Sequence, residues 1–461
     1  MPTPQLDPRD PESRIARLLD GGKFEFLIPR TDCGMVAVTG DIKGNKVVVF
    51  ASDATIKSGA LGVEGSKVIV TAYKAAMGAQ VPIIGIWHSG GARLSDGVAS
   101  LDAFGEVFQS MISASGRIPQ LSLVLGPTAG GGAYGPALTD IVVLSPEGRI
   151  FVTGPDVVKS VTGEDTDMAL LGGPEAHRKN SGLAHIIAAD EDEAITDIRT
   201  LTDLFANQGV MNAEVKDIDL AAFIPQSKVR TYEVHPLVEA ILDTDPEHIE
   251  LLSMWAPNMT TVLGRLGGAT VGVLASNPAH IAGALDAAAG EKAARFVRTC
   301  DAFGIPLIVI ADVQGFLPGA GQEWEGAVRR GAKLLHAFGE AVVPRVTLIT
   351  RRAYGGAYVA MNSKALGATH VFAWPNAEVS VMGAVTAVRV LHRRILADLP
   401  AEQRESMELE LAAEHEKISG GVIRAVEIGA VDEIIEPAKT RSALAKVIAQ
   451  APHRRGAHGN I

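Results

Sequence analysis

The sequence predicts an α/β fold built from two tandem copies of one strand–turn–helix unit. Two observations carry this prediction. Three apolar segments recur in the same order in both halves of the chain, and each ends in glycine. Stretches with helical spacing follow these glycines. With 461 residues, 47% of them hydrophobic, the chain is long enough for more than one domain.

The first repeated segment is an apolar run that ends in a glycine turn. It reads VPIIGIWHSGG over 81–91 and IPLIVIADVQG over 305–315, and Pro82 and Pro306 align at an offset of 224 residues. Runs of about four to eight apolar residues bounded by turn residues are typical of buried strands. We therefore expect a strand before each glycine turn.

Two more segments repeat farther along the chain. IPQLSLVLGPTAGG over 118–131 matches VPRVTLITRRAYGG over 343–356, with prolines 119 and 344 at an offset of 225 residues. SPEGRIFVTG, ending at Gly154, matches WPNAEVSVMG, ending at Gly383, at an offset of 229. Three segments in one order with nearly constant offsets indicate an internal duplication.

Helical stretches between these segments complete the pattern. Val98–Ile112 and Ala327–Phe338 have helical spacing, and strand, turn and helix in repetition predict a mostly parallel sheet. Ligands of such sheets bind beyond the carboxyl ends of the strands, where the repeated glycines fall. We expect the halves to meet between Phe205 and Leu251, in a linker with surface elements, which gives domains over 1–225 and 226–461.

Composition excludes several classes of protein. The chain has 42 basic and 53 acidic residues, a net charge of −11, which argues against a nucleic-acid partner. Two cysteines, Cys33 and Cys300, are too few for a disulfide framework or a four-cysteine zinc site. We therefore expect no metal and a reducing compartment.

The ends of the chain show no targeting signal. The first 14 residues, MPTPQLDPRDPESR, lack an apolar segment and are expected to form a solvated arm. The last 11, APHRRGAHGNI, are expected to be a short polar tail. Because no apolar run is long enough to cross a membrane, the sequence predicts a cytoplasmic protein without a membrane partner.

The glycine turns are candidates for anion stabilisation. TAGGGAYGP over 128–136 and RAYGGAYVAM over 352–361 place glycines between a buried strand and a helix start, where backbone N–H groups can approach a ligand. Oxyanion holes are built from such donors. The alternative is that the glycines only permit tight turns. P-loop, nucleophile-elbow and HExxH patterns do not occur in the sequence, and His88 is best explained as a partly buried structural residue.

Longer motifs resemble a known family. SGGARLSDGVASL (89–101), GPTAGGGAYGPALTD (126–140) and LGGPEAHRKNSGLAH (171–185) resemble the N-terminal half of carboxyltransferase β subunits of acyl-CoA carboxylases. EKAARFVRTCDAFGIPLIVIADVQGFLPGAGQE (291–323) and RRAYGGAYVAMNSK (351–364) resemble the C-terminal half. The resemblance runs from about Ser13 to about Leu444 and is nearest to actinobacterial acetyl- or propionyl-CoA carboxylase subunits.

The resemblance implies two crotonase-like domains, a hexamer, and active sites formed between protomers. The implied reaction transfers CO₂ from carboxybiotin, carried by a partner subunit, to acetyl-CoA or also propionyl-CoA, giving malonyl-CoA for fatty acid and lipid synthesis. Gly130 and Gly131 carry over as the oxyanion hole for the acyl-CoA thioester enolate. Gly356 and Ala357 carry over as the hole for the biotin ureido oxygen. The biotinylated α subunit, with its biotin carboxylase and carrier domain, is a separate chain.

Residues next to these pairs are expected to bind substrate. Two departures from the family pattern bear on them. TAGGGAYGP stands where relatives have CAGGAVYSP, so the first pair could instead be Gly131 and Gly132. Gln314 stands where relatives have a proline in the turn. An apolar Val359 favours acetyl-CoA, because propionyl-type relatives tend to carry Asp there. The expected substrate-binding residues are Gly90, Gly91, Ala92, Arg93, Gly132, Ala133, Gly315, Phe316, Tyr358 and Val359.

Three other functions remain open from the sequence. A biotin-dependent acyl-CoA decarboxylase subunit uses the same half-reaction in reverse. A crotonase-type hydratase or isomerase needs a pair of carboxylates near the oxyanion hole, and Glu106 is the nearest acid to the first glycine block in terms of the repeat. A non-catalytic scaffold subunit of a carboxylase would not need the glycine turns, and both turns are intact.

Overall fold

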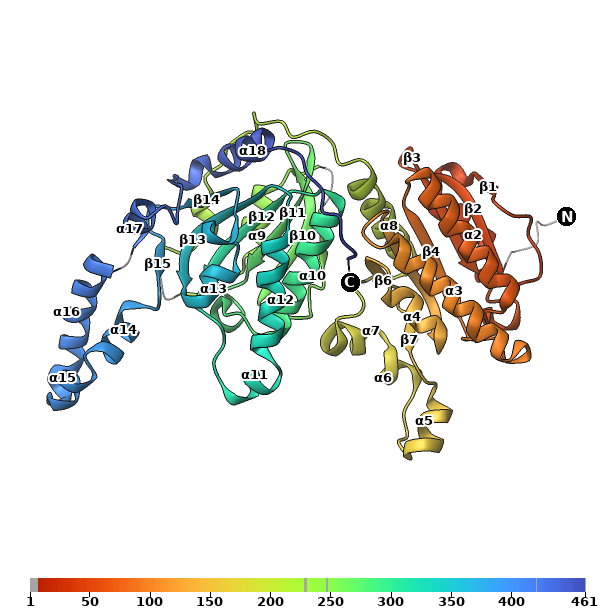
Figure 1. Ribbon diagram of the computed structural model, residues 1–461, viewed down its shortest axis with the longest axis horizontal. Helices are drawn as coiled ribbons and strands as arrows, with labels where there is room; N and C mark the ends of the chain where they lie inside the picture. The colour runs from red at the N-terminus through yellow and green to blue at the C-terminus, as the bar shows by residue number, and fades with distance from the viewer. Residues whose placement is uncertain (1–6, 228–229, 246–247, 420, 461) are drawn as a thin grey trace. The chain divides into compact units, whose positions relative to one another are not determined.

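The computed structural model describes residues 7–227, 230–245, 248–419 and 421–460. The chain divides into two compact units. The first contains the described residues up to Gln208, together with Ile249–Trp255 and the residues from Gly456 onward, and the second contains Gly209–His248 and Ala256–Arg455. Each unit holds its own mixed sheet and helices (Figure 1).

The first unit is built on an eight-stranded sheet with the order β1-β2-β3-β4-β5-β6-β8, and β7 pairs with β5. The pairs β1–β2 and β2–β3 are antiparallel, whereas the pairs β3–β4, β4–β5, β5–β6, β5–β7 and β6–β8 are parallel. The strands are β1 Phe24–Phe26, β2 Met35–Ile42, β3 Asn45–Ser52, β4 Ile83–Ser89, β5 Gln120–Ala129, β6 Ile141–Leu144, β7 Arg149–Phe151 and β8 Ile186–Ile187. The helices are α1 Pro11–Leu18, α2 Val63–Ala79, α3 Val98–Ala114, α4 Gly131–Ala137, α5 Pro155–Thr162, α6 Met168–Gly172, α7 Pro174–Ala176 and α8 Glu191–Ala206, and Ile249–Leu251 forms β9.

The second unit repeats this arrangement. Within this unit the strands lie in the order β16-β14-β13-β12-β11-β10, and β15 pairs with β13. β10–β11 is antiparallel, whereas β11–β12, β12–β13, β13–β14, β13–β15 and β14–β16 are parallel. The strands are β10 Met259–Leu266, β11 Ala269–Ser276, β12 Leu307–Val313, β13 Arg345–Tyr354, β14 His370–Ala373, β15 Glu378–Ser380 and β16 Glu433–Ile434. The helices are α9 His235–Ile241, α10 Ala287–Phe303, α11 Ala320–Trp324, α12 Ala327–Glu340, α13 Gly355–Ala360, α14 Ala384–Leu391, α15 Arg393–Asp398, α16 Ala401–Ser419, α17 Val422–Glu427 and α18 Thr440–Gln450.

The duplication predicted from the sequence is confirmed strand by strand, because β2 to β6 correspond to β10 to β14 in order and direction. The expected helices are present as α3 and α12. In α3 the spacing of Phe104, Val107 and Met111 turns one apolar face to the core, which is why this stretch is an amphipathic helix. α2 packs on β2 and β3 with α3 beside it, and α10 packs on β10 and β11 with α12 beside it (Figure 1).

The residues near the amino end differ from the expected solvated arm. α1 begins at Pro11, the Asp10 side chain accepts from Ser13 N at 2.9 Å, and Arg14 and Ile15 are buried. Asp followed by Pro is a strong helix-start signal, and the apolar spacing then buries one face of the helix. The prediction of an arm is therefore wrong for residues 10–14, and residues 1–6 lie outside the described part.

Two other sequence expectations also need correction. The stretch predicted as a linker contains α9, whose Leu237, Val238 and Ile241 are buried in the core of the second unit. The polar tail is not free: Asn460 is buried in the first unit, and its side-chain amide donates to Asp140 Oδ1 at 2.7 Å. Contacts between residues so far apart in the chain leave no local signal in the sequence.

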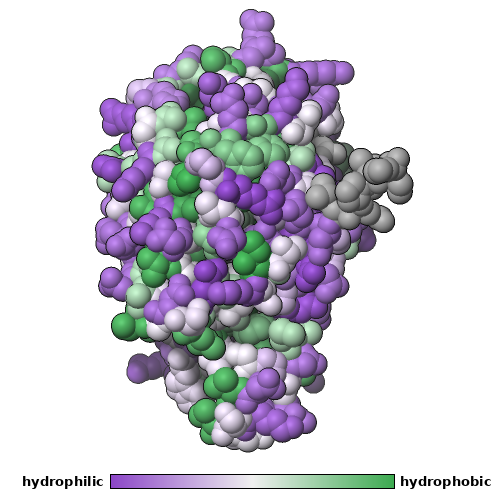
Figure 2. Space-filling model, turned by 90° about the vertical axis from the view of Figure 1, so that its right-hand side faces the viewer, coloured by the Kyte–Doolittle hydropathy of each residue, from purple (hydrophilic) through white to green (hydrophobic). Residues whose placement is uncertain are grey.

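The surface agrees with the charged composition. The face in Figure 2 is covered mainly by hydrophilic residues, with hydrophobic ones in small groups between them. Among the described residues, no helix combines the length and the apolar character that a membrane crossing requires.

Candidate functional site

The first glycine turn joins β5 to α4. Gly130 lies between them with φ 59° and ψ −131°, a conformation that glycine adopts readily and other residues avoid. Its N–H donates to Phe151 O at 3.2 Å. The next two N–H groups, those of Gly131 and Gly132, begin α4 and have no acceptor among the described residues. The turn therefore presents free donors at a helix start.

A second loop, at the end of β4, lies against this turn. Gly91 has φ 92°, and a Cβ there would lie 3.0 Å from Ala129 O, so the two backbones meet closely. Leu61 N donates to Gly91 O and Arg93 N donates to Leu61 O, both at 2.8 Å. This bridge leaves the N–H of Ala92 without a partner within the part of the chain that the structure describes.

The second unit repeats both elements. Gly355, with φ 58°, connects β13 to α13, and the N–H groups of Gly356 and Ala357 start the helix without an acceptor in the described ranges. The loop after β12 forms the same bridge, in which Leu285 N donates to Gly315 O at 3.0 Å and Leu317 N donates to Leu285 O at 2.7 Å. The N–H of Phe316 is left over in the same way.

The structure thus brings together most of the predicted site residues of each unit. Ala92 and Gly91 lie beside the Gly130–Ala133 turn, and a Cβ on Gly356 would lie 3.8 Å from the Phe316 ring. Because the N–H of Gly130 is already used, the free donors in the first unit are those of Gly131 and Gly132. The oxyanion role of either pair stays a prediction.

Two of the predicted side chains have other contacts, and a third is exposed. The Arg93 guanidinium donates from Nη2 to the carbonyls of Cys33 at 2.7 Å and Ala60 at 3.3 Å, so it supports the loop rather than facing a ligand. The Tyr358 hydroxyl donates to Ala430 O at 3.4 Å, and its burial raises the pKa of this phenol. Val359 is half-exposed on α13.

A β-bulge stands behind each turn. The register between β4 and β5 shifts between Trp87 and Ser89, and the register between β12 and β13 shifts between Ala311 and Val313. His88 and Asp312 therefore occupy matching positions, each at the point where the strand bends. The sequence pattern did not single out Asp312, although the 224-residue offset to His88 was available as a signal.

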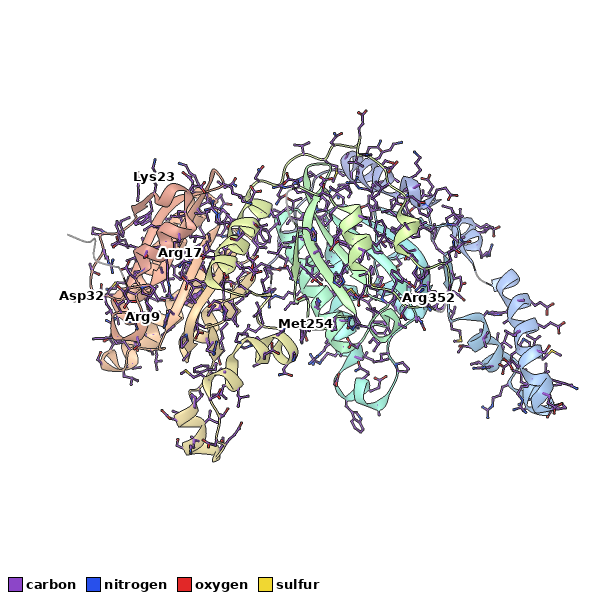
Figure 3. All side chains as sticks on the ribbon, turned by 180° about the vertical axis from the view of Figure 1, so that it is seen from behind. Arg9, Arg17, Lys23, Asp32, Met254 and Arg352 are labelled. Atoms are coloured by element: carbon purple, nitrogen blue, oxygen red, sulfur yellow. The ribbon has the colours of Figure 1, made fainter. Side chains whose placement is uncertain are left out.

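Asp312 holds two arginines beneath the second turn. Arg351 Nε donates to Asp312 Oδ2 at 2.7 Å, and Arg352 Nε (Figure 3) donates to Oδ1 at 3.2 Å. Arg351 also donates to Arg230 O at 2.9 Å and lies 4.7 Å from the centre of the Tyr232 ring. Burial, followed by the Asp312 charge, raises the pKa of the Tyr232 phenol. This network fixes the end of β13, from which the second turn starts.

His88 fills the matching place in the first unit. Its imidazole occupies the space that a side chain at position 126 would need, and Arg14 Nη1 donates to its Nδ1 at 3.4 Å. Burial, with a contribution from the Arg14 charge, lowers the pKa of His88 to about 4. A neutral, packed imidazole agrees with the structural role expected for it.

Comparison with known proteins decides the family. Residues 17–457 match the carboxyl transferase domain family. The chain belongs to the carboxyl transferase family. It is 58% identical over 459 residues to the Mycobacterium tuberculosis "biotin-dependent acetyl-/propionyl-coenzyme A carboxylase beta6 subunit", covering 99% of this chain and 97% of the relative. It is 52% identical over 461 residues to the Rhodococcus erythropolis "propionyl-CoA carboxylase beta chain", with the same two coverages.

A solved structure confirms the fold class. The transcarboxylase 12S crystal structure, described as a hexamer assembly with methylmalonyl-coenzyme A bound, matches with a TM-score of 0.91 and 35% identity. The match covers 97% of this chain and 91% of that one. The carboxyl transferase chain described here therefore has the predicted pair of tandem crotonase-like halves.

Proposed function

We propose that this chain is the carboxyltransferase subunit of a biotin-dependent acyl-CoA carboxylase. It transfers CO₂ from carboxybiotin on a partner subunit to acetyl-CoA, and also to propionyl-CoA, and so supplies lipid synthesis. The observation that carries the proposal is the duplicated set of free N–H donors at two matched strand-to-helix turns. The names of the two carboxylase relatives support the substrate class.

The first set of donors suits the acyl-CoA. A thioester that loses its α-proton develops negative charge on its carbonyl oxygen, and donors at a helix start stabilise such charge without reorganising. Gly131 and Gly132, with Ala92 on the adjacent loop, supply those donors. A Cβ on Gly91 would lie 3.0 Å from Ala129 O, so the adjacent loop has no room for a side chain at this position.

The second set suits the biotin. Its ureido oxygen, an acceptor, would be held by the N–H groups of Gly356, Ala357 and Phe316, which have no acceptor among the described residues. When bound, carboxybiotin supplies the CO₂ and then the nitrogen that takes the α-proton. We accordingly assign the domain over 1–225 to the acyl-CoA and the domain over 226–461 to the biotin.

A hydratase or isomerase fits the site less well. Glu106, the acid that this alternative requires, is exposed on α3. It lies two residues from Phe104, whose ring would contact a Cβ on Gly131 at 3.3 Å. Residues two apart on a helix point in different directions, so Glu106 does not face the donors.

We also propose a homo-oligomer, a hexamer like the transcarboxylase 12S relative, with each active site completed by a neighbouring copy. Large apolar side chains are exposed next to both turns: Leu94 is 93% exposed, Trp324 86% and Val381 78%. Exposed apolar side chains in such numbers are typical of surfaces that become buried in an assembly. Unpaired Cys33 and Cys300 are consistent with a cytoplasmic location.

An assay that needs no partner tests the proposal. The purified protein is incubated with malonyl-CoA or methylmalonyl-CoA and free biotin, and consumption of the acyl-CoA is measured. Biotin-dependent decarboxylation is expected. Consumption that does not depend on biotin would indicate another crotonase-type reaction, and no consumption of either compound would contradict a carboxyltransferase.

A further inference from the structure

A groove in the second unit lies between the edge strand β16 and helix α18. Its volume is about 860 Å³. Phe372, Ile435 and Val447 give it an apolar floor, and Glu433 and Lys446 lie on its rim. Among the described residues, β16 pairs only with β14, so its other side is an open sheet edge. The groove lies away from the glycine turn, which starts at the far end of β13 (Figure 1).

The internal duplication shows what this groove corresponds to. In the first unit, β8 is the edge strand and α8 follows it, as α18 follows β16. His185 lies directly before β8. Its backbone N–H donates to Val142 O at 2.9 Å, and its side-chain Nδ1 accepts from Val142 N at 3.1 Å. Asp432 lies directly before β16. Its backbone N–H donates to Val371 O at 2.9 Å, and its carboxylate Oδ2 accepts from Val371 N at 2.8 Å. The two edges are thus equivalent, down to these capping bonds.

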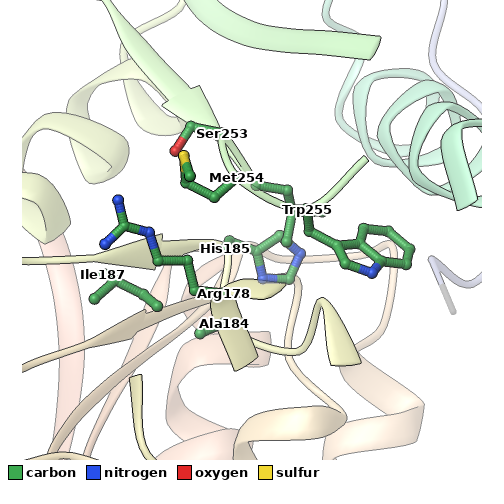
Figure 4. Close-up of a pocket in the computed structure, with 8 residues that line it drawn as sticks. Arg178, Ala184, His185, Ile187, Ser253, Met254 and Trp255 are labelled. Atoms are coloured by element: carbon green, nitrogen blue, oxygen red, sulfur yellow. The ribbon is translucent and has the colours of Figure 1, made fainter. Parts of the chain in front are cut away.

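In the first unit, the segment that begins with β9 lies against α8 and the start of this edge, and among the described residues no strand pairs with the free side of β8. Ile249–Leu251 contacts α8, and Leu252 N donates to His185 O at 2.7 Å. Leu252, Trp255 and Ile187 of β8 line one small pocket. Figure 4 shows Trp255 and Ile187 at this pocket. The Trp255 indole takes the space that a side chain at position 182 would occupy.

The second unit lacks such a segment among the described residues. No backbone N–H in the described ranges donates to Asp432 O, which is the counterpart of the His185 carbonyl. His370, in the groove wall, has a buried Nε2 without a hydrogen-bond partner in the described part of the chain. Unsatisfied buried groups of this kind point to a missing polar partner.

We propose that this groove docks an extended segment of the biotinylated partner subunit. The segment would run along β16, donate an N–H to Asp432 O, place apolar side chains over Phe372 and Val447, and bring a carboxylate to Lys446. Adding a strand to an open edge gives affinity through the backbone and specificity through alternate side chains. This inference rests on the proposed carboxylase function, because that function requires the partner.

The composition of the groove favours a separable partner over a second copy of this chain. Permanent interfaces between copies are strongly apolar, and the chain has such surfaces beside the glycine turns, at Leu94 and Trp324. The groove instead combines its apolar floor with exposed charges. Lys446 is exposed and forms no ion pair with any described residue, so it is available to an incoming carboxylate.

The test separates docking from catalysis. Lys446→Glu and Gln450→Trp change exposed residues of α18 that line the groove, and Lys74→Glu reverses an equally exposed lysine on α2 as the matched control. Carboxylation is measured against the concentration of the purified biotinylated subunit, and decarboxylation is measured with free biotin. We expect the KM for the biotinylated subunit to rise on the order of tenfold in both groove variants. The free-biotin rate and the Lys74→Glu protein should be unchanged.

Other outcomes would overturn the proposal. An unchanged KM in both groove variants means that the partner docks elsewhere. A smaller mass by light scattering in Lys446→Glu means that the groove joins copies of this chain. If the groove variants do not fold, amide hydrogen exchange of β16 and α18 is measured in the unaltered protein with and without the biotinylated subunit. The proposal requires that the biotinylated subunit slows exchange in both elements, and unchanged exchange would overturn it. A protein without free-biotin activity contradicts the proposed function itself, and the exchange measurement still reports on docking.

Discussion

Replacing Gly130 with alanine should disable the first turn without removing any donor from it. A Cβ at Gly130 has no contact closer than 3.9 Å, so the change adds no steric clash. It does force an alanine into φ 59° and ψ −131°. Relaxation of that strain rotates the peptide that leads into α4 and turns the N–H groups of Gly131 and Gly132 away from their present direction.

The expected size of the effect follows from two separate terms. A non-glycine residue in such a conformation costs about 1–3 kcal/mol of stability. Loss of one oxyanion donor typically lowers kcat on the order of 100- to 1,000-fold, or about 2.7–4 kcal/mol of transition-state stabilisation. Gly97 separates the two terms, because it has φ 57° and ψ −138°, and a Cβ there would meet no atom within 4 Å.

The assay compares Gly130→Ala with Gly97→Ala. Both should lose a similar free energy of unfolding in urea, whereas only Gly130→Ala should lose kcat in biotin-dependent decarboxylation. Equal stability losses with a normal kcat in Gly130→Ala would refute the assignment of the first turn as an oxyanion hole. An equally large loss of kcat in Gly97→Ala would show that strain alone explains the effect.

Four further predictions concern the assembly, the substrate and the buried polar groups. Gly131→Val and Gly356→Val should each abolish turnover, and mixing the two proteins under subunit exchange should restore part of it; no recovery would place each site within one chain. Val359→Asp should shift the kcat/KM ratio of acetyl-CoA to propionyl-CoA towards propionyl-CoA, by about 10- to 200-fold at most, and an unchanged ratio would mean that chain length is selected elsewhere. Asp312→Asn should cost about 3–5 kcal/mol in urea unfolding, because two largely buried arginines lose their carboxylate; a loss below about 1 kcal/mol would contradict that coupling. The lowered pKa of His88, about 4, means that the unfolded chain binds a proton that the folded chain does not, so stability present above pH 6.5 should be lost as the pH falls towards 4. Because His88 is partly exposed, this loss should be about 1–2 kcal/mol, and His88→Asn should flatten the pH profile of the unfolding free energy.

Local features of the sequence were enough to predict the duplicated fold and the position of both glycine turns. Strand, turn and helix are local features, and they leave periodic apolar residues and glycines at fixed offsets, as in 118–131 and 343–356. The helix starts at α3 and α12 follow from the same local rules. The family motifs lie on these same segments, so the two turns proposed as the site could be identified before the fold was known.

Which N–H groups of the two turns are free depends on contacts between distant parts of the chain. The N–H of Gly130 is taken by Phe151 O, a residue from another strand, and this shifts the free donors to Gly131 and Gly132. Long-range packing also brings Arg14 within hydrogen-bonding distance of His88, and Asn460 within hydrogen-bonding distance of Asp140. A hydrogen bond between residues distant in the chain depends on where the folded backbone brings them, and no spacing in the sequence records that distance.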